Sequence, residues 1–380
     1  MKEDVKYKLD QIANVWNDFI WEYGICKKTI KFTSDIQTNY FGDILSYFQD
    51  TFDIIFDNSE SKSYSDKFSN QISLLQSIYV QQDFIEELLI IFKCGIDKGE
   101  LKKDSNYFIN REIRNELVGH PIRKNRGQFI SSCLFSYEGR SDKIAYLRYH
   151  KDNNYEFESM EFEISDIVLR HRDFLIKYFD KILDKLKRIL SSFVKELENL
   201  EVLLNSKSFE ELLNILTVFY ETIFKYDFIY DKESLLNIYS RKDEHRRYQN
   251  IIDNFYRDLK SSLKEKKEYA IEVFEPNKIF EEFEIERPEF DIKIIKFIDA
   301  STRTKTEKTE IPVTYNYELG KIATKRNIID FRHFGGTLKR KCAENQTVLN
   351  ELEHMELNID DEIEYFSAFK LIWNELNNDD

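Results

Sequence analysis

The sequence predicts a mainly α-helical protein with an antiparallel β-meander inserted between helices and an α+β module at its C-terminal end. Three observations lead to this prediction. The 380 residues include only 10 glycines and 4 prolines, so few residues interrupt long helices. Apolar residues recur every three or four positions through most of the chain, which is the helical period. Between about residues 129 and 164 they alternate instead, which is typical of strands.

Four helices are expected before the alternating segment, over residues 5–23, 34–56, 66–94 and 106–118. The fourth reaches the tripeptide Gly119-His120-Pro121. Because a residue that precedes proline is pushed out of the α conformation, His120 should lie at or just past the end of this helix.

The alternating segment predicts three strands, over residues 129–137, 144–150 and 155–164, which places the β insertion at about 128–164. The third strand changes phase along its length. Tyr155 and Phe157 alternate in one phase, and Met160 and Phe162 in the other. Such a slip predicts a β-bulge near Ser159.

The helical period returns at Ser165 and continues to Leu200, which predicts one helix of more than about 50 Å. A polar stretch after it indicates a domain boundary, with a helical domain over 1–204 and an α+β module over 205–380. That module should contain helices at 209–226, 232–267, 340–356 and 360–376 and strands at 271–274, 290–298 and 310–317. We expect it to sense a signal, regulate the first domain or bind a partner.

Composition limits the class of protein. Hydrophobic residues make up 42% of the chain, which predicts a folded rather than a disordered protein. The four cysteines are far apart, which indicates free thiols in a reducing compartment. The sequence shows no apolar leader and no run of membrane-spanning length, so we expect a cytoplasmic protein that has no membrane partner. No two histidines lie three or four positions apart and no nucleotide-binding signature is present, so we expect no metal and no cofactor.

Charge is distributed unevenly. The net charge of −14 argues mildly against a nucleic-acid partner for the surface as a whole. Residues 101–126, in contrast, hold seven basic and three acidic residues, a local net charge of +4. This reversal is what an anion-binding site on an acidic protein would look like.

The central part of this basic segment resembles the R-x(4–6)-H motif of HEPN domains, including the polar residue that follows the arginine. Its sequence is Arg114-Asn115-Glu116-Leu117-Val118-Gly119-His120. The resemblance covers about residues 1–200, where helices precede the motif and a long helix follows it. It implies a HEPN-like helical bundle over 1–204 and a metal-independent endoribonuclease. In such families two protomers pair, so a homodimer with a composite cleft is expected. The ribose 2′-OH then attacks the adjacent phosphorus and leaves a 2′,3′-cyclic phosphate. Families of this type act as toxins or as effectors of antiviral defence.

The resemblance assigns catalytic roles to three residues. His120 would move a proton to or from the 2′-OH or the leaving oxygen. Arg114 would stabilise charge on the phosphate, and the Asn115 amide would orient the histidine or the phosphate. Along an ideal helix axis Arg114 and His120 are about 9 Å apart, so two copies across a dimer axis would grip one phosphate better than one copy.

Four neighbouring cations are expected to contact adjacent phosphates of an RNA substrate: Arg111, Arg123, Lys124 and Arg126. One position departs from the family pattern. HEPN toxins controlled by nucleotidyltransferase partners often carry a tyrosine two residues after the histidine, but here that residue is Ile122. This departure puts that kind of regulation in doubt and leaves cleavage untouched.

Other interpretations remain open. Arg114 could be a solvated helix residue and His120 a helix cap, in a non-catalytic HEPN-like scaffold that dimerises and binds proteins or RNA. The acidic C-terminal module would suit an antitoxin, an activator or a defence-complex partner. The segment Arg241–Tyr248, which contains His245, is interpreted as a charged helix face, and Phe331–Gly336 as a turn.

Overall fold

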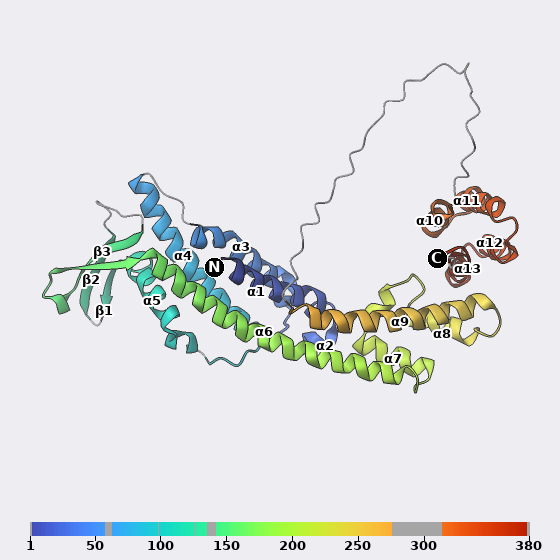
Figure 1. Ribbon diagram of the computed structural model, residues 1–380, viewed down its shortest axis with the longest axis horizontal. Coiled ribbons are helices and arrows are strands. Elements are labelled where there is room, and N and C mark those ends of the chain that lie inside the picture. The colour runs from blue at the N-terminus through green and yellow to red at the C-terminus, as the bar shows by residue number, and fades with distance from the viewer. Residues whose placement is uncertain are drawn as a thin grey trace, which may run out of the picture. The chain divides into compact units, whose positions relative to one another are not determined.

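The computed structural model describes residues 2–57, 63–97, 99–125, 127–134, 142–275 and 314–377, which divide into two compact units. The first unit contains residues 1–198 and 269–274, and the second contains 199–268 and 275–380. The described chain is mainly helical (Figure 1). Its α-helices are α1 (Lys2–Val15), α2 (Gly24–Lys27), α3 (Phe41–Phe56), α4 (Tyr64–Ile91), α5 (Ser105–Arg114), α6 (Ile164–Leu203), α7 (Phe209–Phe219), α8 (Lys232–Ser240), α9 (Arg246–Glu272), α10 (Asn316–Thr324), α11 (Ile328–Lys341), α12 (Gln346–Leu357) and α13 (Glu362–Asn377).

Short π and 3₁₀ turns extend or join these helices: η1 (Trp16–Ile20), η2 (Ile36–Tyr40), η3 (Glu100–Lys103), η4 (Asn115–Gly119), η5 (Lys151–Asn153) and η6 (Glu221–Lys225). The region predicted as one helix over 34–56 is the π turn η2 followed by α3. The region predicted as one helix over 232–267 is two helices, α8 and α9, with a break at residues 241–245. No helix in the described ranges has both the length and the apolar character needed to cross a membrane.

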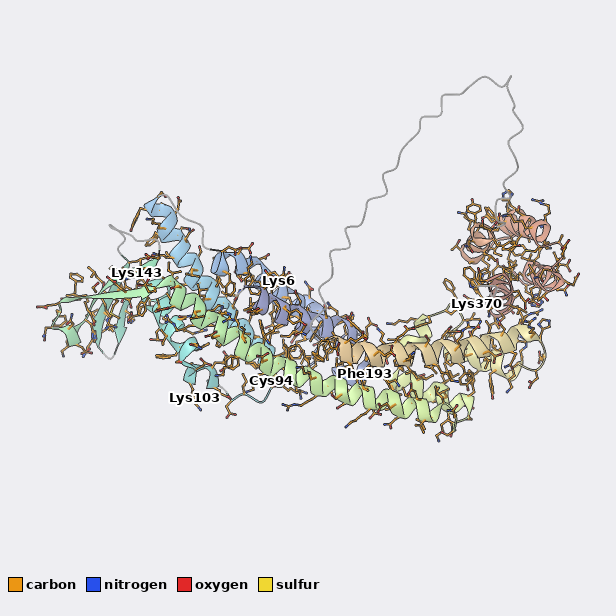
Figure 2. The ribbon with its side chains drawn as sticks, viewed as in Figure 1. Lys6, Cys94, Lys103, Lys143, Phe193 and Lys370 are labelled. Atoms are coloured by element: carbon orange, nitrogen blue, oxygen red, sulfur yellow. The ribbon has the colours of Figure 1, made fainter. Side chains whose placement is uncertain are left out.

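The core of the first unit is rich in aromatic rings. Helix α6 is about 60 Å long and supplies the buried Phe179 and Phe193 to this core. Figure 2 labels Phe193 on this helix. The Phe179 ring lies 5.7 Å from Phe48 of α3, and the Phe193 ring lies 5.7 Å from Phe19 of η1. These contacts join the N-terminal helices to the long helix, as its periodicity predicts.

An antiparallel sheet follows α5 in the chain, with strand order β1-β2-β3-β4. Its strands are β1 (Ile122–Asn125), β2 (Gln128–Leu134), β3 (Lys143–Tyr149) and β4 (Phe157–Glu163). The last three match the predicted meander, although residues 135–141 lie outside the described residues. Strand β1 was not predicted. The predicted bulge near Ser159 is wrong, because the β3–β4 register runs without interruption from Tyr149↔Phe157 to Lys143↔Glu163.

One face of this sheet packs on the helices. Ile144 of β3 is fully buried and belongs to a cluster with Ile113 of α5 and Leu75 and Ile78 of α4. Leu134 and Phe162 join it from β2 and β4. The sheet is therefore anchored to the helix that carries the Arg114–His120 segment.

The second unit shows only helices among its described residues. The strand expected at 271–274, which falls in the first unit, is wrong, because α9 continues to Glu272. The expected strand at 290–298 lies outside the described residues, as do residues 310–313 of the strand expected at 310–317. The turn predicted at Phe331–Gly336 is also wrong, since α11 spans it.

Candidate active site

Helix α5 is fixed in place by polar contacts from three directions. At its start the Asp104 carboxylate accepts a hydrogen bond of 2.9 Å from the backbone N–H of Asn106 and caps the helix. The buried amide of Gln82 on α4 donates to the Tyr107 carbonyl at 3.1 Å, and Asn110 donates to the Ile167 carbonyl of α6 at 2.9 Å. The segment that ends at Arg114 is thus held against both long helices.

The chain leaves α5 through a π turn rather than through a regular α turn. The His120 backbone N–H donates to the Asn115 carbonyl at 2.7 Å, which closes this wider turn. His120 has left the helical conformation and is exposed, so its position at the helix end, predicted from Pro121, is confirmed. Isolated π turns of this kind occur frequently at functional sites.

The Arg114 guanidinium lies among neutral groups. Its Nε and one Nη donate to the Gln76 side-chain oxygen at 3.2 and 2.9 Å, and the other Nη donates to the Asn115 side-chain oxygen at 3.3 Å. Its carbon centre lies 3.8 Å from the centroid of the Tyr79 ring. Within the described ranges no carboxylate forms an ion pair with it, so its charge is not neutralised and two of its five N–H groups are left to bind an anion.

Gly119 brings the arginine close to the histidine. A Cβ atom at this position would lie 2.7 Å from an Nη of Arg114, so the glycine backbone touches the guanidinium. Asn115 also connects the two residues, through its side chain to Arg114 and through its carbonyl to the His120 N–H. The structure therefore brings the side chains of Arg114 and Asn115 into contact and connects both residues to the backbone at Gly119 and His120.

The four cations that we expected to contact RNA differ in their availability. Arg111 forms an ion pair with Asp83 at 2.7 Å and stacks on Tyr79. Lys124 is exposed, with its Nζ 5.2 Å from the Phe129 ring centroid. Arg126 lies outside the described residues.

Arg123 is part of a network around the carboxylate of Glu116. It donates to Glu116 at 2.6 Å and to the His120 carbonyl at 3.3 Å. The Tyr146 hydroxyl donates to the other Glu116 oxygen at 2.5 Å, and burial together with this carboxylate raises the pKa of Tyr146. Arg123 thus holds the backbone of the histidine, which makes it a positioning residue in this structure.

Sequence reasoning did not find Gln76 and Tyr79. Both lie on α4, more than 30 positions before Arg114, and they have the spacing of ordinary residues on a helix surface. Only the packing of α4 against α5 shows that they form the wall behind the arginine. The sequence contains no local signal that would have identified them.

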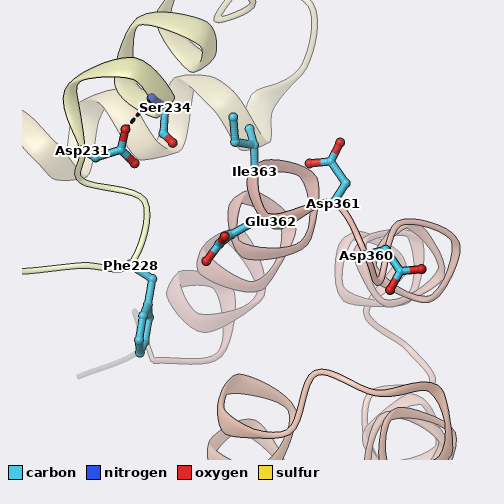
Figure 3. A pocket seen from close by; sticks show the side chains of 7 residues that line it. All are labelled: Phe228, Asp231, Ser234, Asp360, Asp361, Glu362 and Ile363. Atoms are coloured by element: carbon cyan, nitrogen blue, oxygen red, sulfur yellow. Dashed lines mark hydrogen bonds between the residues drawn. The ribbon is translucent and has the colours of Figure 1, made fainter.

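A second polar site lies in the second unit. Figure 3 shows a pocket whose walls carry Asp231, Asp360, Asp361 and Glu362. Asp231 and Asp361 are occupied as helix caps, for α8 and α13 respectively. No group of three or more metal-ligating side chains is placed to hold an ion in the described part of the chain, and helix capping accounts for Asp231 and Asp361.

Comparison with protein-family models, with curated proteins and with solved structures found no match to this chain.

Proposed function

We propose that the protein is a metal-independent endoribonuclease of the HEPN type, which works as a homodimer in antiviral defence or as a toxin. The observation that supports it best is the environment of Arg114. The guanidinium has only neutral partners among the described residues and touches the glycine that precedes an exposed histidine. A cation without a counter-ion beside a group that can exchange a proton is suited to a phosphodiester.

The proposed reaction needs no external nucleophile. The ribose 2′-oxygen attacks the adjacent phosphorus, the bond from phosphorus to the 5′-oxygen breaks, and a 2′,3′-cyclic phosphate remains. The 2′-OH proton goes to a base, and the departing 5′-oxygen takes up a proton. His120 performs one of these transfers, and the second copy of His120 in the dimer performs the other. Arg114 binds the non-bridging oxygens, where negative charge grows.

One observation favours a second candidate function, a non-catalytic scaffold that binds partners. Arg111 and Arg123 are each paired with a carboxylate of this chain, so two of the expected phosphate contacts are already neutralised. Under this alternative the Glu116 network has a purely structural role.

The deciding experiment measures cleavage of a total-RNA or tRNA pool in EDTA. We expect His120→Ala and Arg114→Ala each to lower the rate by about 10²- to 10⁴-fold. The products of the wild type should carry cyclic phosphate ends. His333→Ala is the matched control, since His333 is an exposed histidine in the second unit. Equal or absent cleavage in all variants, with the dimer intact by sedimentation, would favour the scaffold.

A further inference from the structure

The outer face of the sheet, which faces away from the helix core, is unusually apolar at one end. The strand register places Ile122, Ser131, Tyr149 and Phe157 in one row across all four strands. Phe129 lies on the same face, one row further along β2. We call the apolar members of this group the aromatic platform: Ile122, Phe129, Tyr149, Phe157 and the adjoining Tyr155.

Four of the five platform side chains are exposed rather than covered by the rest of the described chain, and Tyr149 is half-buried. Ile122 is 77% exposed, Phe129 68%, Phe157 64% and Tyr155 54%. Antiparallel sheets with one buried face normally present polar residues on the other face. Large apolar side chains gathered on an exposed surface indicate a binding site.

The geometry of the rings suits flat ligands. Tyr149 lies 5.4 Å from Phe157 and 5.7 Å from Tyr155, centroid to centroid, so these three rings form one continuous surface. By strand geometry Phe129 stands about 12 Å from Phe157 across the sheet. This distance leaves room for two or three nucleobases between and over the rings, as in other sheets that bind single-stranded RNA.

The charged side chains on this face are placed to suit a phosphate backbone. The exposed Lys124 places its ammonium next to the Phe129 ring, at the platform end. The acids Glu161 and Glu163 lie toward the opposite end of the same face, where they pair with Lys143 at 3.4 and 2.8 Å. A phosphate backbone that crossed the platform would therefore meet a cation beside the rings, with Glu161 about 14 Å and Glu163 about 20 Å from Phe157 along β4.

The platform is continuous with the candidate active site through the chain itself. Ile122 follows His120 by two residues, and the Pro121 carbonyl accepts a 2.7 Å hydrogen bond from Ser132 of β2. The histidine loop and the first strand of the platform are thus fixed to the same sheet. An RNA strand held on the platform would therefore lie next to the chain segment that carries His120.

We propose that the aromatic platform binds single-stranded RNA by stacking bases on Phe129, Tyr149 and Phe157, with Lys124 contacting the backbone. The inference rests on the proposed ribonuclease function and names its substrate class, which is unpaired rather than duplex RNA. Aromatic rings with a neighbouring cation favour nucleobases over an aliphatic protein surface, because every base offers a face for stacking.

The test is direct binding of a fluorescein-labelled single-stranded 12-nucleotide RNA of mixed sequence to the full-length chain, measured by anisotropy in EDTA. The His120→Ala background prevents cleavage during the measurement. We expect Phe129→Ala and Phe157→Ala each to weaken binding by about tenfold or more, and Phe129→Trp to retain it. Phe228→Ala is the matched control, because Phe228 is a 73% exposed phenylalanine of the second unit. A duplex of the same sequence should compete poorly.

Several outcomes would overturn the inference. Binding that is unchanged in both platform variants, or no binding by any protein, would reject the platform as an RNA site. Conversion of a dimer to a monomer in both variants, seen by sedimentation, would identify the face as a contact between two copies of this chain. If the wild type cleaves RNA and the Phe129→Ala and Phe157→Ala variants with His120 intact cleave it equally fast, the ribonuclease proposal stands and the platform is rejected. RNA binding that depends on the platform, without cleavage by the wild type, would support the platform as an RNA site and reject the ribonuclease.

Discussion

Arg114 in the first unit and Arg247 in the second each lie close to a histidine, but their surroundings differ in charge. The buried Arg247 donates to both oxygens of Glu351, at 2.8 and 3.1 Å, and its other end contacts His354. Among the described residues Arg114 has only neutral partners, which include the amides of Gln76 and Asn115 and the Tyr79 ring. The first arrangement is neutralised within the chain, whereas the second leaves a charge for an external anion.

The neighbouring histidines, His354 and His120, differ in the same way. His354 is hydrogen bonded to the Glu364 carboxylate at 2.8 Å, so its ring is occupied. His120 is exposed, and among the described residues its hydrogen bonds involve only its backbone. An arginine beside a histidine is therefore not by itself a sign of function. The number of carboxylates around the pair distinguishes a structural cluster from a candidate active site.

The largest loss of stability is expected when the neutralised cluster is broken. Glu351→Ala removes a carboxylate whose side chain is 2% exposed and leaves the Arg247 charge buried. We expect the free energy of unfolding of the second unit to fall by about 3 kcal/mol, measured by urea denaturation.

Two further variants sharpen this result. Glu353→Ala removes an exposed carboxylate from the same helix and should change stability by less than about 0.5 kcal/mol. The double variant Arg247→Leu/Glu351→Leu should recover part of the loss, because it leaves no unpaired charge. A loss for Glu351→Ala no larger than for Glu353→Ala would show that the cluster is not a structural one.

Sequence patterns predicted the positions of helices better than they predicted the surroundings of individual side chains. The 3.6-residue period located α4, α6 and α7, because each buries one side along its length. Interpretation of the segment Arg241–Tyr248 as a charged helix face was wrong for Arg247, which is buried. Its partner Glu351 lies 104 positions away, and no local pattern reports such a pairing. For the same reason the sequence showed the Arg114–His120 motif but not the neutral side chains of Gln76 and Tyr79 that contact Arg114.

The sheet shows a different limit. Strand β1 has the sequence Ile-Arg-Lys-Asn, too short and too charged to show alternation, and it forms by pairing with β2. The phase slip at Ser159 came from apolar residues on both faces of one regular strand, Phe157 outward and Met160 and Phe162 inward. What looked like a bulge was the sequence signal of the aromatic platform.

A third histidine extends the comparison to a fully buried ring. His171 of α6 donates from Nε2 to the Gln81 side-chain oxygen at 2.8 Å, and burial lowers the pKa of His171 to about 3. In the unfolded chain a histidine takes up a proton near pH 6.5. The unfolded state therefore binds the proton first, and stability falls as the pH drops below 6.5, by about 1.4 kcal/mol for each pH unit until about pH 3.

His171→Gln separates this effect from the titration of carboxylates. Urea denaturation at pH 7 and pH 5 should show that the wild type loses about 2 kcal/mol more than the variant over this interval. Parallel losses in the two proteins would mean that His171 is protonated inside the fold or reached by water.

The smallest change in stability, and the sharpest test of the comparison, comes from Gln76→Glu. This substitution gives Arg114 the carboxylate that Arg247 already has, at a side-chain oxygen that now accepts two of its hydrogen bonds. Because the pair would be half-exposed, we expect stability to change by less than about 1 kcal/mol. Cleavage should nevertheless fall by about 10- to 100-fold, since the guanidinium would be neutralised before substrate arrives and a negative charge would stand where phosphate binds.

Gln37→Glu, an exposed glutamine of the same unit, adds the same charge away from Arg114 and should leave cleavage unchanged. If Gln76→Glu cleaves as well as the wild type, the unneutralised charge of Arg114 is not what the reaction uses, and the distinction between the two arginines loses its functional meaning.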